Sequence, residues 1–160
     1  HEKNTLTCLD QSLLVNAYGM TLLIPATRMW SEYLANHKSS QSVTDPILTS
    51  FMDILKDVIN DIPEEIALIV IRFKSGQISL NEMFEEARKR VNLLINTYGY
   101  SIGYAHGLEL ELSDSFPELF ETMSKSKLSL TLDSLGNELS FLMIKYEANT
   151  LAGFDDFSPL

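Results

Sequence analysis

The residues best suited to chemistry lie in one stretch, NTYGYSIGYAHGLELEL at positions 96–112, which holds three glycines, three tyrosines and a histidine. His106 could act as a general base, because an imidazole titrates near neutral pH and Glu109 or Glu111 could tune its pKa. A ligand pocket there would be formed by Gly99, Gly103, Tyr104 and His106. The interpretation we favour is that His106 ends a helix and complements its dipole.

The three glycines are spaced four residues apart, so they would line one side of a helix. Each glycine inside a helix costs roughly 1 kcal/mol relative to alanine, so such a helix needs a compensating contact. A ridge without side chains lets a second backbone or a flat ligand approach closely. We expect the helix to continue to about Ala105 and to break near His106-Gly107. The alternating LELEL that follows could instead form a short strand.

Acidic residues are concentrated in the second half of the chain. The net charge is −10, and no Lys or Arg occurs between Val91 and Ser124. This charge disfavours nucleic-acid binding, which depends on cations, and favours a basic protein partner. The partner-binding surface is predicted to contain two tyrosines and five acids, namely Tyr100, Tyr104, Glu109, Glu111, Asp114, Glu118 and Glu121. The alternative interpretation is that these acids only keep the protein soluble.

Motifs for other kinds of chemistry are absent from the sequence. It contains no nucleotide-binding loop, calcium loop or nucleophile elbow, and its three histidines lack the spacing of metal ligands. The single cysteine, Cys8, excludes an internal disulfide and is expected to be a small buried hydrophobe. We therefore predict no catalytic residue, no cofactor and no metal site.

The elements that would position these residues are predicted to be helices. In the first part of the chain, apolar residues recur at three- and four-residue steps over positions 6–24. Pro25 should stop or kink this helix, since proline lacks the backbone donor. A second helix with the same spacing is expected to follow, as far as His37.

Two further helices are predicted in the middle of the chain. Asp45-Pro46 supplies a cap and a proline suited to the first turn of one of them. A separate helix is predicted over 63–74, and its body IALIVIRF is apolar enough to be buried near the centre of the fold. Ser79 and Glu82 then form a capping box at the start of the helix that carries the glycines.

The C-terminal part of the chain offers a leucine seam and a tail. Apolar residues alternate four- and three-residue steps from Leu128 to Tyr146, as in a coiled coil. This seam either packs into the core or forms a homodimer through Leu128, Leu132, Leu135, Leu139 and Leu142. The tail 153–160 carries two phenylalanines around two aspartates, and either folds back onto the bundle or docks into a partner.

These patterns predict an all-α fold, a single-domain bundle of six to seven helices over 1–152 followed by the acidic-aromatic tail. No apolar run approaches the ~20 residues that span a bilayer, so we expect no membrane insertion. The single cysteine slightly favours the cytoplasm. We predict a non-enzymatic interaction module, either an inhibitor or immunity-type protein or a regulatory adaptor. The alternative is a ligand-binding sensor or small enzyme with a pocket within 98–107.

Overall fold

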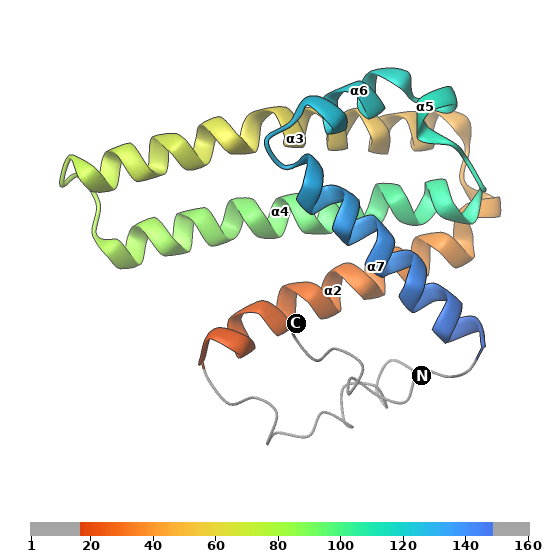
Figure 1. Cartoon of the computed structure of the whole chain (residues 1–160), viewed down its shortest axis with the longest axis horizontal. Helices are drawn as coiled ribbons and strands as arrows, with labels where there is room; N and C mark the ends of the chain where they lie inside the picture. Colours follow the sequence, from red (N-terminus) through yellow and green to blue (C-terminus); the bar gives the residue numbers. More distant parts are fainter. Residues whose placement is uncertain (1–16, 149–160) are drawn as a thin grey trace.

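The computed structural model describes residues 17–148, which form an all-α bundle (Figure 1). Its six α-helices and one short 3-10 helix are α2 (Ala17–Ser39), η2 (Ser40–Ser42), α3 (Asp45–Lys74), α4 (Leu80–Gly107), α5 (Leu112–Ser115), α6 (Pro117–Lys125) and α7 (Ser129–Glu147). The predicted all-α class is confirmed. No strand occurs between residues 17 and 148, so LELEL forms a turn and the start of α5.

Two of the expected helix boundaries are wrong, because prolines lie inside continuous helices. Pro25 lies within α2, and Pro63 lies within α3, which joins the two helices predicted on either side of it. A proline inside a helix costs roughly 3 kcal/mol. In α3 the residues before and after Pro63 share one packing surface, since Ile59, Ile62 and Ile69 are all buried. This common burial offsets the cost of the proline.

Helices α3 and α4 form a long antiparallel hairpin that organises the molecule (Figure 1). The predicted capping box begins α4, with the Ser79 hydroxyl accepting from the Glu82 amide and the Glu82 carboxylate accepting from the Ser79 amide. Two ion pairs join the helices near the closed end of the hairpin, Arg72 with Glu86 at 2.7 Å and Arg90 with Glu65 at 3.0 Å.

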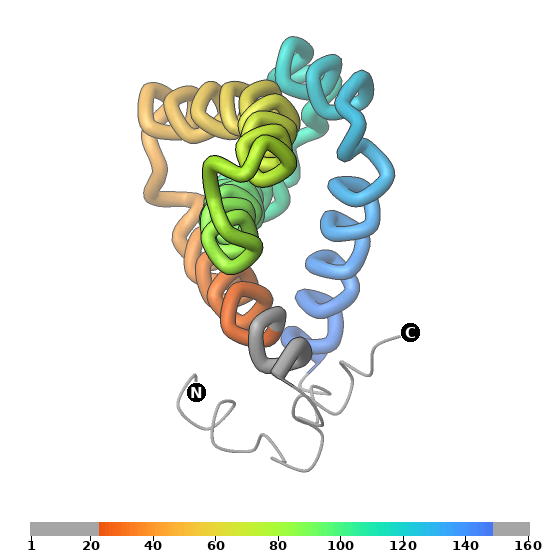
Figure 2. Tube along the Cα trace, turned by 90° about the vertical axis from the view of Figure 1, so that its left-hand side faces the viewer, coloured from red at the N-terminus to blue at the C-terminus, as the bar shows by residue number. Residues whose placement is uncertain are grey.

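Helix α4 is the central element of the fold. It packs against α2 and α3, and the side view shows α6 and α7 along one side of this three-helix layer (Figure 2). The prediction that helix 63–74 is central is wrong, because Leu68 and Ile71 are exposed where the closed end of the hairpin extends past the other described helices (Figure 1). A segment that is apolar on nearly all sides is therefore not necessarily surrounded by other helices.

The leucine seam of α7 lies in the chain's own core, which was one of its two predicted locations. Leu132, Leu139 and Leu142 are buried, and Leu128 and Leu135 pack against the same core. The Tyr98 hydroxyl of α4 also donates a hydrogen bond to the Leu132 carbonyl at 2.7 Å. These leucines are therefore not a free surface, and the structure gives the homodimer through them no support.

Some predictions fall outside the described residues. Cys8, the beginning of the apolar stripe over 6–24, and the tail 153–160 are among them. Of the helices that lie between residues 17 and 148, none is both long and apolar enough to cross a bilayer.

Candidate functional site

The glycine ridge of α4 is occupied by α2 of the same chain. A Cβ atom added at Gly99 would lie 2.8 Å from the Met29 carbonyl oxygen, and one at Gly103 would lie 2.6 Å from the Tyr33 carbonyl oxygen. One at Gly107 would lie only 2.5 Å from the His37 carbonyl oxygen. The close approach predicted from the spacing is therefore a helix–helix contact. The α2 backbone fills the space that Gly99 and Gly103 would have offered to a ligand.

Helix α4 ends where the spacing predicted, but the residue that reverses the chain is not the glycine. The helix includes Gly107, and the following amides of Leu108, Glu109 and Leu110 bond back to carbonyls of the last turn. Glu109 has a φ of 55°, in the left-handed region that favours glycine. Gly107 is used instead for the contact with α2.

His106 belongs to a partly buried polar cluster where α2, α4 and α7 meet. Its Nδ1 atom lies 2.9 Å from the Tyr33 hydroxyl, and the Ser140 hydroxyl of α7 lies 3.5 Å from the same atom. With the ring proton on Nε2, Tyr33 donates to Nδ1. Tyr33 is almost fully buried, and its ring also stacks on Trp30. This environment holds the three helices together.

Burial lowers the pKa of both histidines at this junction, and charged neighbours shift these pKa values further. Burial lowers the pKa of His106, and His37 lowers it further, against an opposing effect of Glu111. Burial and then Lys38 lower the pKa of His37, while Glu147 opposes them. Burial raises the pKa of Tyr33 to about 12, with Glu147 acting in the same direction. Among residues 17–148, the buried His37 Nδ1 atom has no hydrogen-bond partner.

The two tyrosines predicted to bind a partner face away from this cluster and pack between α3 and α4. Tyr100 stacks on Phe51 with ring centroids 5.9 Å apart, and Tyr104 stacks on the same ring at 5.4 Å. Both are half-buried. A hydrogen bond to Glu32, followed by burial, raises the pKa of Tyr100. They form an aromatic cluster of Phe51, Tyr100 and Tyr104.

The five acids predicted to face a partner are all exposed, and they divide into two groups. Glu118 pairs with Lys56 at 2.9 Å, which lowers the pKa of Glu118, and Glu121 pairs with Lys125. Within the described residues, no salt bridge involves the other three, Glu109, Glu111 and Asp114. We call these three residues, at the turn between α4 and α5, the acidic end.

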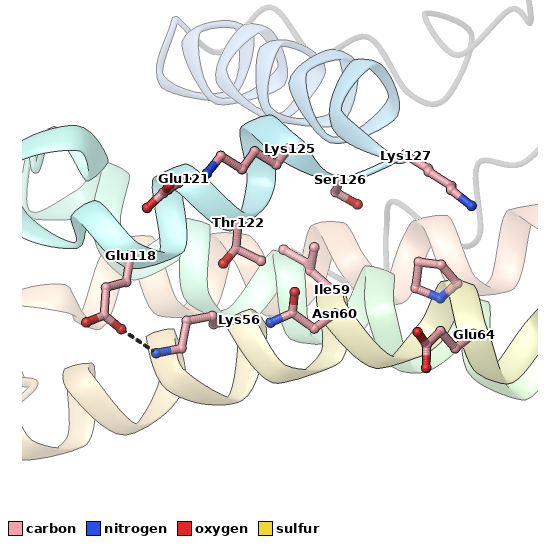
Figure 3. Close-up of a pocket in the computed structure, with 11 residues that line it drawn as sticks. Lys56, Ile59, Asn60, Glu64, Glu118, Glu121, Thr122, Lys125, Ser126 and Lys127 are labelled. Carbon is pink, nitrogen blue, oxygen red and sulfur yellow. Dashed lines mark hydrogen bonds and ion pairs between the residues drawn. The ribbon is translucent and has the colours of Figure 1, made fainter.

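A groove of about 580 Å³ between α3 and α6 was missed by the sequence reasoning (Figure 3). Ile59 and Pro63 contribute apolar surface to it, and its charged lining is Lys56, Glu64, Glu118, Glu121, Lys125 and Lys127. These six charges balance, and the lining contains neither histidine nor cysteine. No local pattern could have joined two segments more than fifty residues apart in the sequence.

Among residues 17–148, no group of three or more His, Cys, Asp or Glu side chains could hold a metal ion. Comparisons with protein-family models, with curated proteins and with solved structures found no match to this chain. The function is therefore inferred from the surface and the buried clusters alone.

Proposed function

We propose that the protein is a non-enzymatic interaction module, of the inhibitor, immunity or regulatory-adaptor kind, that presents an acidic surface to a basic protein partner. The observation that carries this proposal is the acidic end. Glu109, Glu111 and Asp114 are exposed within six residues of chain and have no ion-pair partner in the described part of the molecule. A partner with Lys or Arg groups would supply the missing counter-charges.

The elements around the acidic end support its use as a rigid surface. Helix α4 reaches it from the centre of the fold, and the glycine contacts with α2 fix the position of that helix. The chain then turns directly into α5 and α6, which pack against each other. A rigid surface loses little conformational entropy on binding. Its field would also speed the association with a cationic partner, in a manner that salt weakens.

The other predicted partner-binding residues, the paired acids and the tyrosines of the aromatic cluster, have contacts within the chain itself. Glu118 and Glu121 retain lysine partners, so a basic protein would have to exchange these pairs for new ones. Exposed ion pairs are screened by water and salt and contribute little to stability, so such an exchange would lose little. Tyr100 and Tyr104 position α4 against α3 through Phe51.

The experiment that tests this proposal is affinity capture with the tagged chain from cells that make it, at low and high salt. A captured basic protein, identified by mass spectrometry and then purified, should bind the chain in a salt-sensitive way. Glu109→Lys combined with Glu111→Lys should weaken that complex while leaving the helical circular-dichroism signal unchanged.

The matched control is Asp133→Lys combined with Glu138→Lys, which makes the same charge change on exposed positions of α7. This control should retain most of the binding. Equal binding by the wild type and the Glu109/Glu111 variant would refute the placement of the surface. A partner that is itself acidic would refute the proposed function.

A further inference from the structure

One face of α3 carries exposed apolar residues at heptad spacing. Ile47, Ile54 and Leu68 are 50%, 47% and 59% exposed, and they are separated by seven, or twice seven, residues. Side chains seven residues apart differ by only about 20° around a helix, so the three form one stripe. Asp61 occupies the remaining heptad position. Apolar residues at heptad spacing are typical of a helix that packs against a second helix.

The stripe is continuous with the aromatic cluster. Phe51 lies four residues after Ile47 and three before Ile54, and it stacks on both tyrosines of the cluster. On α4, Leu93 is 45% exposed and precedes Tyr100 by seven residues. These residues of two helices form one surface, which we call the docking face: Ile47, Phe51, Ile54, Leu68, Leu93 and Tyr100.

No described helix covers the docking face. On α4, Tyr98 bonds to Leu132 of α7, and Tyr100, two residues later, lies about 200° further around the helix. The docking face is therefore on the side of the layer opposite α7. Figure 2 shows α6 and α7 together on one side of α3, α4 and α2, with no helix from residues 17–148 along the other side.

The rim of the docking face is acidic. Asp57 and Glu64 are exposed along α3, three residues from Ile54 and four from Leu68, and the exposed Asp61 lies within the stripe itself, seven residues from both. None of the three forms a salt bridge within the described residues, whereas the nearby cations Arg72 and Arg90 already have acidic partners. The stripe thus carries three acids without a salt bridge in the described part of the molecule, and one of them, Asp57, lies near Lys56.

We propose that the docking face binds an amphipathic helix of a partner protein, with an apolar side flanked by Lys or Arg residues. The stripe from Ile47 to Leu68 is about 32 Å long at 1.5 Å per residue, the length of about six helical turns. A helix fits because its apolar residues can repeat with the spacing of the stripe. Basic flanks would pair with Asp57, Asp61 and Glu64.

The charges on the rim distinguish this partner from a second copy of the chain. A homodimer through the docking face would bring the same acidic row against itself in a chain whose net charge is −10. Like charges placed opposite one another oppose association. This inference rests on the proposed function and names the binding mode of the basic partner.

The test uses a fluorescent synthetic peptide of three heptads, with Leu at the two apolar positions of each heptad and Lys at the positions that flank them. Fluorescence anisotropy should show the peptide binding to the wild-type chain. Ile54→Ser combined with Leu68→Ser should weaken binding about tenfold or more, since the variant loses two of the three exposed apolar residues of the stripe. Both side chains are exposed, so the variant should remain folded.

Two controls separate this binding mode from general attraction to an acidic protein. Leu130→Ser combined with Ile144→Ser removes even more exposed apolar residues, on the outer side of α7, and should change the affinity less than about twofold. A matched peptide with Glu in place of Lys should not bind. Asp57→Asn, Asp61→Asn and Glu64→Gln together should weaken the Lys peptide and flatten its salt dependence.

Several results would overturn the proposal. They are failure of the wild type to bind the Lys peptide, equal binding by the Ile54/Leu68 variant, or equal binding of the Glu peptide. If sedimentation showed that the chain is a dimer and that Leu68→Ser dissociates it, the docking face would be assigned to a second copy of the chain. The acidic end is tested separately with the captured partner and the Glu109/Glu111 variant, so either surface can fail alone.

Discussion

Replacement of Gly103 by alanine distinguishes a packed ridge from an ordinary helix interior. In an exposed helix this change would stabilise the protein by roughly 1 kcal/mol, because alanine has the higher helix propensity. Here the added Cβ would lie 2.6 Å from the Tyr33 carbonyl oxygen and 3.1 Å from the Tyr33 Cα. Both are backbone atoms, so α2 itself must move.

The two effects oppose each other, and the contact should dominate. Overpacking of a well-packed interior costs roughly 1–3 kcal/mol, and here the neighbour is a helix backbone that cannot rotate away. Movement of α2 would also stretch the 2.9 Å hydrogen bond from Tyr33 to His106. We expect Gly103→Ala to destabilise the fold by up to about 2 kcal/mol, which is the cost of overpacking less a propensity gain of roughly 1 kcal/mol.

Urea denaturation followed by circular dichroism measures this free energy of unfolding. The single tryptophan, Trp30, stacks on Tyr33, so its fluorescence reports displacement of α2 in the same samples. Ala67→Gly is the control, because at this exposed position of α3 it changes the helix propensity without changing a close contact. It should lower the free energy of unfolding by about 1 kcal/mol. A Gly103→Ala variant more stable than the wild type would show that α2 does not lie against the ridge.

Three smaller perturbations test the junction of α2, α4 and α7 and the end of α4. The pKa values of His37 and His106 are lowered by folding from 6.5, so below about pH 6.5 the unfolded chain takes up protons that the folded chain does not. Between pH 7.5 and pH 5.5, stability should fall as the pH drops through 6.5 towards the folded pKa values, and His106→Gln should reduce this loss in the urea midpoints. Tyr33→Phe removes the hydroxyl from the His106 Nδ1 atom and should cost about 1 kcal/mol of unfolding free energy at pH 7.5; an unchanged midpoint would contradict the hydrogen bond. Glu109→Gly removes the strain of a side chain at a φ of 55° and should raise the free energy of unfolding by about 0.5–1 kcal/mol, seen as a slightly higher melting temperature. A lower melting temperature would contradict this account of the turn.

Local sequence patterns predicted the elements and several of their contacts. The capping box at Ser79 is a pairing over three residues, so the sequence contains all of it. The four-residue spacing of the glycines in α4 predicted a close helix contact, and the seven-residue pattern of α7 predicted a shared face. Periodicity assigns residues to a face of a helix, which is why these predictions agree with the structure.

Periodicity could not predict which other element packs against each helix face. The segment 63–74 is apolar on nearly all sides, yet α6 and α7 end before they cover it, and Leu68 and Ile71 are exposed. Pro25 was expected to stop or kink a helix and Pro63 to begin one, yet both lie inside continuous helices, and in α3 residues on both flanks of Pro63 are buried. The groove between α3 and α6 depends on the same long-range contacts.

The central claim, that this chain acts by binding a basic protein, is tested most directly by native mass spectrometry of the chain purified at low salt from cells that make it. We predict a complex whose added mass is that of a protein, whose sequence is basic, and which dissociates as the salt concentration rises. An added mass of only a few hundred daltons, lost on denaturation, would contradict the claim and identify the chain as a small-molecule binder.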